Sequence, residues 1–120
     1  MSSHAAFRYA LLVAAAILAG CGGAKVVDPV ALGSSYKSLK SADDALAAKK
    51  YAEAIPLYDE AIKAGVLQAD QLAEVYLRRA VCKIETGDKA GATDDLAKAE
   101  QGGAVGDDYQ AAQKRLIAKK

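Results

Sequence analysis

From Ser34 onwards, apolar and small residues recur every three or four positions, with polar and charged residues between them. This spacing is typical of amphipathic helices, which bury one stripe of side chains and expose the rest. Gly, Lys and Asp residues interrupt the pattern at four places, and Ala-rich stretches fill the intervals. The pattern therefore predicts an all-α fold with helices at residues 35–48, 52–64, 70–86, 89–100 and 107–119.

The apolar run near the start of the chain has a different character. Residues 9–19 carry no charge and follow the basic residue Arg8. The run is shorter than the roughly 20 apolar residues of a membrane-spanning helix, and it is typical of a secretory signal peptide. We expect residues 1–20 to be a cleaved signal peptide. The alternative is a short buried helix.

The residues that end this run, Leu18-Ala19-Gly20-Cys21, resemble the signal of bacterial lipoproteins. The resemblance implies cleavage before Cys21, a diacylglyceryl thioether on its sulfur and usually a third acyl chain on the new amine. Two or three chains suffice to anchor a protein stably in a membrane. Gly22 stands where an Asp favours the inner membrane, so the resemblance implies the periplasmic face of the outer membrane in a Gram-negative host. The alternative is a free or disulfide-bonded Cys21.

Cleavage would also restrict the chemistry of the chain. It removes His4, the only histidine, and Arg8, so that basic and acidic residues become equal in number. Without histidine, the Ser–His and Cys–His nucleophile arrangements are absent. The sequence contains no Gly-rich phosphate loop, no spaced set of metal ligands and no basic excess that would indicate nucleic acid. We therefore expect no enzymatic activity, no cofactor, no metal and no nucleic-acid partner.

Residues 21–34 contain several glycines and Pro29, and they lack helical periodicity. This composition predicts a flexible tether with a typical reach of roughly 20 Å. The folded domain, residues 35–120, would then lie close to the membrane.

Two segments of this domain repeat at a fixed distance of 38 residues. The aligned pairs are Ala54 with Ala92, Tyr58 with Leu96 and Ala61 with Ala99. Together with Tyr76, Ala80 and the turn Gly87-Asp88, these residues are similar to the tetratricopeptide repeat, in which small residues let two helices cross closely.

The resemblance implies two helix–turn–helix repeats, at about residues 35–65 and 70–102, in a right-handed α–α superhelix. The family period is about 34 residues, and we assign the four extra residues to the junction at residues 65–70. The alternative is a generic Ala-rich helical bundle.

The last predicted helix, residues 107–119, begins with Asp107-Asp108 and ends with basic residues, a polarity that suits the helix dipole. We expect it to be a capping helix that covers the exposed edge of the second repeat. Two repeats are fewer than the three usually needed for stability, so the domain should be marginal alone or be stabilised by self-association or a partner.

The remaining reactive groups are interpreted as structural. Cys82 is expected to be a buried thiol, because a reactive one needs a nearby cation to lower its pKa; Arg79 and Lys83 lie on the same helix and leave a redox role open. Adjacent helical residues point about 100° apart, so the acidic pairs are interpreted as solvated faces and caps. These pairs are Asp43-Asp44, Asp94-Asp95 and Asp107-Asp108.

Binding is the remaining class of function. In tetratricopeptide proteins the first helices of successive repeats line a concave groove that holds peptides or helices. Carried onto this chain, the resemblance implies a groove of Tyr36, Leu39, Lys40, Asp43, Leu46, Glu74, Leu77, Arg78, Val81 and Ile84. The alternative places several of the apolar members in the core.

Together these observations predict a membrane-anchored lipoprotein that acts as a non-enzymatic protein–protein interaction adaptor in the bacterial envelope. Its partner would be an envelope protein or peptide that the sequence does not identify. One alternative is a self-associating structural lipoprotein that dimerises through the groove. The other is a redox protein that acts through Cys82.

Overall fold

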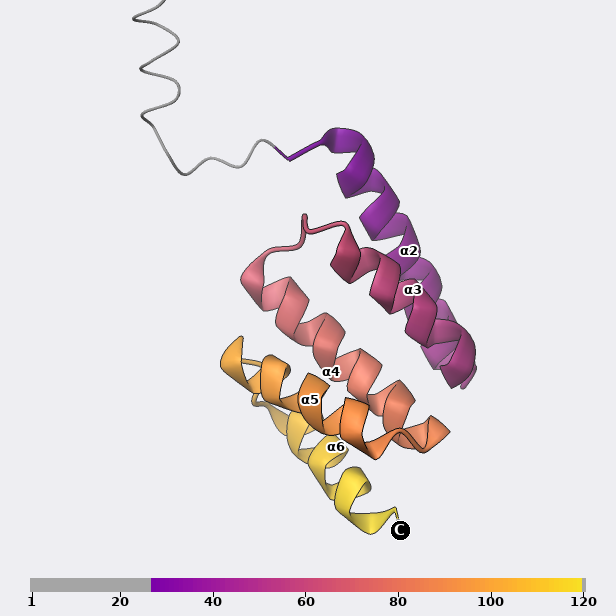
Figure 1. Ribbon diagram of the computed structural model, residues 1–120, viewed down its shortest axis with the longest axis vertical. Coiled ribbons are helices and arrows are strands. Elements are labelled where there is room, and N and C mark those ends of the chain that lie inside the picture. Colours follow the sequence, from indigo (N-terminus) through magenta and orange to yellow (C-terminus); the bar gives the residue numbers. More distant parts are fainter. Residues whose placement is uncertain (1–26, 120) are drawn as a thin grey trace, which may run out of the picture.

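The computed structural model describes residues 27–119, which form five α-helices (Figure 1). In chain order they are α2 (Pro29–Ala47), α3 (Tyr51–Lys63), α4 (Ala69–Thr86), α5 (Lys89–Gln101) and α6 (Asp107–Ala118). This part of the chain contains no strand, so the all-α prediction is confirmed. None of its helices is both long and apolar enough to cross a bilayer. The predicted signal peptide and Cys21 lie outside the described residues.

The helices form two hairpins and one additional helix (Figure 1). α2 packs against α3, and α4 packs against α5. The two hairpins meet where α3 lies along α4, and α6 packs against both α4 and α5. The arrangement agrees with two helix–turn–helix units followed by a helix that covers the second unit.

The first helix begins earlier than the sequence analysis predicts. α2 starts at Pro29, so residues 29–34 are helical and the prediction of a tether up to residue 34 is wrong. The side chain of Asp28 accepts a hydrogen bond from the Val30 N–H at 2.9 Å and caps the helix. Pro29 occupies the first helical position, where its missing N–H costs nothing and its fixed φ suits the helix. A residue interpreted as a breaker is therefore a helix start.

The turns inside the two hairpins share one geometry. At the end of α4, Gly87 adopts a positive φ of 90°, and the N–H groups of Gly87 and Asp88 donate to the carbonyls of Ile84 and Lys83. This pattern satisfies the last carbonyls of a helix and favours glycine at the left-handed position. In the first hairpin that position is Lys49, 38 residues earlier, with a φ of 61°.

The loops that leave the two hairpins are also equivalent. Residues 64–68 connect α3 to α4, and residues 102–106 connect α5 to α6, so the two loops have the same length. Each contains a glycine with positive φ, Gly65 and Gly103, again 38 residues apart. α4 starts at Ala69, as the predicted early start of that helix requires.

Two hydrophobic clusters hold the helices together, and α4 contributes to both. One face of α4, which carries Leu77 and Ile84, packs with residues of α5 and α6 such as Leu96. Another face, which carries Val75 and Cys82, packs with residues of α2 and α3 such as Tyr58. Buried alanines on α2, α3, α4, α5 and α6 allow the helix axes to approach closely, as the small residues of the repeat predict.

Candidate functional site: a groove along α2, α4 and α6

The first helix of each hairpin and the additional helix α6 border two hollows that follow one another along α4. The first hollow has a volume of about 410 Å³ and lies between α2, the first half of α4 and the loop at residues 102–104. The second has a volume of about 400 Å³ and lies between α2, α4 and α6. Arg78 lines both hollows. We refer to the two hollows together as the groove.

Arg78 is held in place by an acid of the neighbouring hairpin. Its Nη1 donates to both carboxylate oxygens of Asp43, at 3.1 and 2.9 Å. Asp43 Oδ1 also accepts a 2.7 Å hydrogen bond from the hydroxyl of Tyr58. Burial and the adjacent Asp43 carboxylate raise the pKa of Tyr58 far above its ordinary value, so the hydroxyl stays a donor. This chain of contacts fixes both the position and the charge state of Arg78.

The first hollow combines one apolar wall with acidic side chains. Leu39 of α2 supplies the apolar wall. Asp70, Glu74 and Arg78 follow one another on successive turns of α4 along the same side of the hollow. None of the side chains between residues 27 and 119 forms an ion pair with Asp70 or Glu74.

The second hollow is more apolar. Leu46 of α2, Leu77 and Val81 of α4 and two alanines of α6 form its surface. Asp108 and Arg115 lie at its α6 border. Arg115 binds Glu85 at 3.4 Å, whereas Asp108 has no ion-pair partner among the described residues.

Several of the groove residues predicted from the family resemblance lie where it places them. The residues that line one of the two hollows are Leu39, Leu46, Glu74, Leu77, Arg78 and Val81. Asp43 reaches the groove through its ion pair with Arg78. Tyr36 exchanges hydrogen bonds with Gln71, a residue that lines the first hollow.

The structure corrects three of these assignments. Ile84 is only 1% exposed, because it packs in the cluster that α4 forms with α5 and α6, and it lines neither hollow. Leu77 belongs to the same cluster and contributes only a 4% exposed surface. Lys40 points to solvent, where it pairs with Asp44 at 3.2 Å, and it lines neither hollow.

The sequence analysis missed the contribution of α6. Asp108, Ala111, Ala112 and Arg115 line the second hollow, but the last helix was interpreted only as a cap. Their spacing of three or four residues could have indicated a second functional face of this helix. The loop at residues 102–104 was missed because its place beside α4 depends on tertiary packing.

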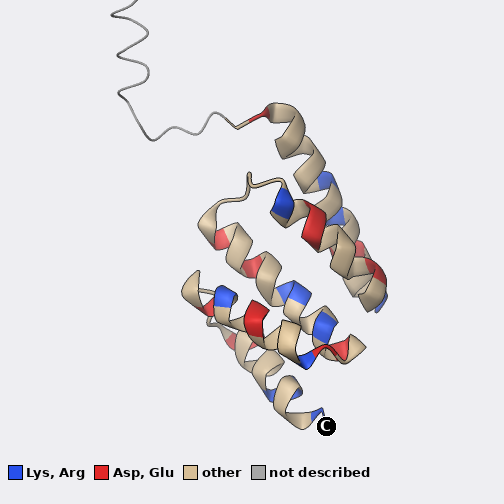
Figure 2. Cartoon of the chain, viewed as in Figure 1, with Lys and Arg blue, Asp and Glu red and all other residues tan. Residues whose placement is uncertain are grey.

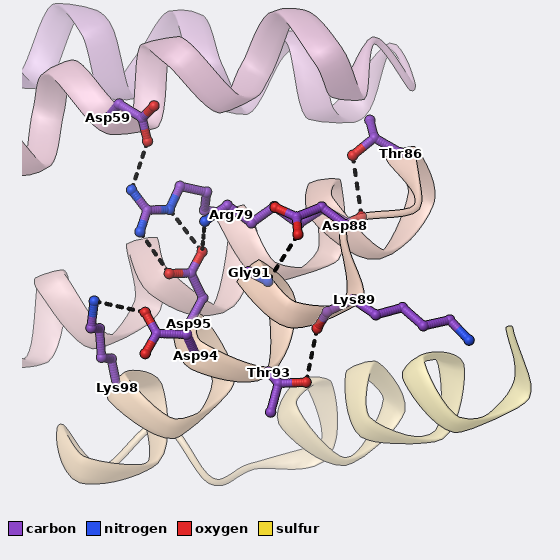
Figure 3. A network of polar contacts seen from close by, with 11 residues as sticks. Asp59, Arg79, Thr86, Asp88, Lys89, Gly91, Thr93, Asp94, Asp95 and Lys98 are labelled. Carbon is purple, nitrogen blue, oxygen red and sulfur yellow. Dashed lines mark hydrogen bonds and ion pairs between the residues drawn. The ribbon is translucent and has the colours of Figure 1, made fainter. Parts of the chain in front are cut away.

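A second polar network lies away from the groove, between α3, α4 and α5 (Figure 3). Arg79 donates to Asp59 of α3 at 2.6 Å and, through two nitrogens, to Asp95 of α5 at 2.7 and 2.6 Å. Lys83 also pairs with Asp95, at 3.0 Å. The hydrogen bonds with Asp95 raise the pKa of Arg79 above its already high ordinary value, so Arg79 is always charged.

This network and the groove correct the interpretation of two acidic residues as solvated. Asp95 is fully buried, and Asp43 is half-buried and paired. The divergence of adjacent helical residues explains why each pair splits, but it does not reveal that one member faces a buried cation. Asp44 and Asp94 do face solvent, as predicted.

Cys82 is a buried free thiol, as the sequence analysis expects. Burial raises its pKa to about 11, so the protonated form dominates at neutral pH. The nearby basic residues do not activate it, because Arg79 and Lys83 are both engaged with Asp95.

Comparison with known proteins provides no further assignment. No family model, curated protein or solved structure matches this chain. The groove is therefore interpreted from its own geometry.

Proposed function

We propose that the protein is a lipid-anchored, non-enzymatic adaptor that holds an extended segment of an envelope protein in its groove. The observation that supports this proposal most directly is the pair of hollows along α4. Each has a volume within the roughly 300–1,000 Å³ typical of ligand sites, and the second has an apolar surface that suits a buried side chain.

Arg78 gives the groove a fixed polar group between the hollows. Among the described residues it uses only Nη1, which bonds Asp43. Its Nε and Nη2 are therefore free to donate to backbone carbonyls of a bound segment, since a guanidinium has five N–H donors. Side chains of the segment on either side of that contact would enter the two hollows.

Anchoring supplies the second part of the proposed mechanism. The lipoprotein-like residues Leu18–Cys21 would carry acyl chains on Cys21, which confine the domain to a membrane surface. Confinement raises the effective concentration of the groove near other membrane proteins without any new contact. A groove of modest affinity could then act on a partner at the same membrane.

Site-specific photocrosslinking in intact cells would test the proposal. A photoreactive amino acid at Val81 in the groove is compared with one at Ala52, an exposed residue of α3 outside both hollows. We expect Val81 to capture one envelope protein, with the yield falling when Leu46→Glu obstructs the second hollow and when Cys21→Ser removes the anchor. Equal capture from both positions, or no loss in the Leu46→Glu background, would contradict a groove-bound partner.

Self-association is the second candidate, and one observation favours it. A further hollow of about 320 Å³ lies between α5 and α6, lined by apolar residues that include Leu96 and Leu116. Ile117 at its border is 80% exposed, an unusual exposure for a large apolar side chain beside other apolar residues. Sedimentation of the purified chain with and without Ile117→Lys distinguishes the two, because only a dimer built on this face would dissociate.

A further inference from the structure

We infer that the segment bound in the groove is cationic, with a Lys or Arg side chain in the first hollow and an aliphatic side chain about three residues away in the second. The inference rests on the proposed function and specifies the chemistry of its ligand.

The charges around the groove leave an excess of carboxylates. Arg78 and Asp43 neutralise each other, and Arg115 is bound to Glu85. The acids Asp70 and Glu74 in the first hollow and Asp108 in the second have no cationic partner among the described residues. A cation in the first hollow would lie between two carboxylates that one helical turn separates, so its charge is complementary to the site.

Helix stabilisation accounts for some of these acids but not for all of them. Asp70 and Asp108 lie in the first turns of α4 and α6, where a negative charge favours the helix dipole. Glu74 lies in the second turn of α4, beyond the range of that effect. Its i,i+4 neighbour Arg78 is turned to Asp43 instead, so Glu74 lines the hollow as an exposed, unpaired carboxylate.

The two hollows set the spacing of the ligand. Glu74 marks the first and Val81 the second, and seven residues of helix separate them, or about 10 Å. An extended chain covers that distance in about three residues. Figure 2 shows that the acidic positions of α4 precede its main group of basic positions. A cationic side chain therefore fits the end of the groove near the start of α4.

Selection of peptides against the purified full-length chain in mild detergent tests the inference. Short random peptides are displayed and selected at about 50 mM salt, and the recovered peptides are measured against variants. We expect a basic residue followed about three positions later by an aliphatic one. Glu74→Gln should weaken these peptides about fivefold, and the double variant Asp70→Asn, Glu74→Gln about twentyfold. The matched control Glu53→Gln, an exposed acid of α3 outside both hollows, should leave affinity unchanged.

The outcomes separate this inference from the proposed function. Peptides that Val81→Glu displaces but that lack a basic residue, or that bind Glu74→Gln as tightly as the wild type, overturn the inference and leave the groove as a binding site. Recovery of no peptide that depends on Val81 counts against both. A dimer that Val81→Glu dissociates identifies a second copy as the occupant and overturns the inference of a separate cationic segment.

Discussion

Arg78 and Arg79 are adjacent in the sequence but serve different parts of the molecule. Successive residues of a helix differ by about 100° in direction, so Arg78 lines the groove and Arg79 enters the network between α3 and α5. Their environments differ as much as their directions. The Arg78 side chain is 40% exposed, whereas that of Arg79 is 13% exposed and contacts a fully buried carboxylate.

The two arginines should therefore differ in their effect on stability. Arg79→Met removes the main partner of buried Asp95 and should lower the free energy of unfolding by about 3 kcal/mol. Lys83 remains beside Asp95 and limits the loss. Arg78→Met breaks a half-exposed pair and should cost less than about 1 kcal/mol. Urea denaturation followed by circular dichroism measures both values, and equal losses would show that the network contributes no more than a surface pair.

The Cys82 thiol gives the stability of the protein a dependence on alkaline pH. Its pKa is about 11 in the fold, against 9.0 for an ordinary thiol, so the neutral form is favoured on folding. The associated stability is fully present below pH 9 and is lost as the pH rises toward 11. Between about pH 8 and pH 10 the wild type should lose about 1 kcal/mol more than Cys82→Ala. Identical pH profiles in urea titrations of the two proteins would contradict the assignment.

At the scale of elements, the sequence predicted the helices well wherever their limits depend on local signals. The turns at Gly87 and Gly103 and the start of α5 at Asp88 follow from capping and glycine preferences. The start of α2 was missed because the same dipeptide, Asp28-Pro29, can end one element or begin another. The direction of the apolar pattern did not decide between these roles, since residues 29–34 are mostly exposed.

Lys49 is the weak point of the first hairpin. It occupies the left-handed position at the end of α2, where a residue with a Cβ costs roughly 1–2 kcal/mol. Lys49→Gly should therefore stabilise the protein by about 1 kcal/mol, after the larger chain entropy of glycine in the unfolded state is offset. Lys49→Ala separates this effect from loss of charge. It keeps the Cβ and should not stabilise the protein, and thermal melts that rise equally for both variants would contradict the explanation.

At the scale of the whole molecule, α4 connects everything that the sequence analysis could not place. It shares a hydrophobic cluster with each neighbouring hairpin, and its charged residues reach both sides. The pairing of Arg78 with Asp43, 35 residues away, and of Arg79 with Asp59 and Asp95 depends on how the hairpins dock. A single sequence contains no local signal for such contacts. The groove was consequently predicted on the correct helices but with Ile84 and Lys40 wrongly included and α6 left out.

The equal loops at residues 64–68 and 102–106 have a consequence for how such a chain can grow. Gly65 and Gly103 occupy the same backbone conformation one repeat apart, so residues 66–103 form a unit whose two ends match. A tandem duplication of the DNA that encodes this unit would join compatible ends without a new kind of turn. The added hairpin would meet the surface of α4 and α5 that α6 now covers, and α6 would move outward as the terminal helix. The gene thus holds a ready module for lengthening the groove by one step at a time.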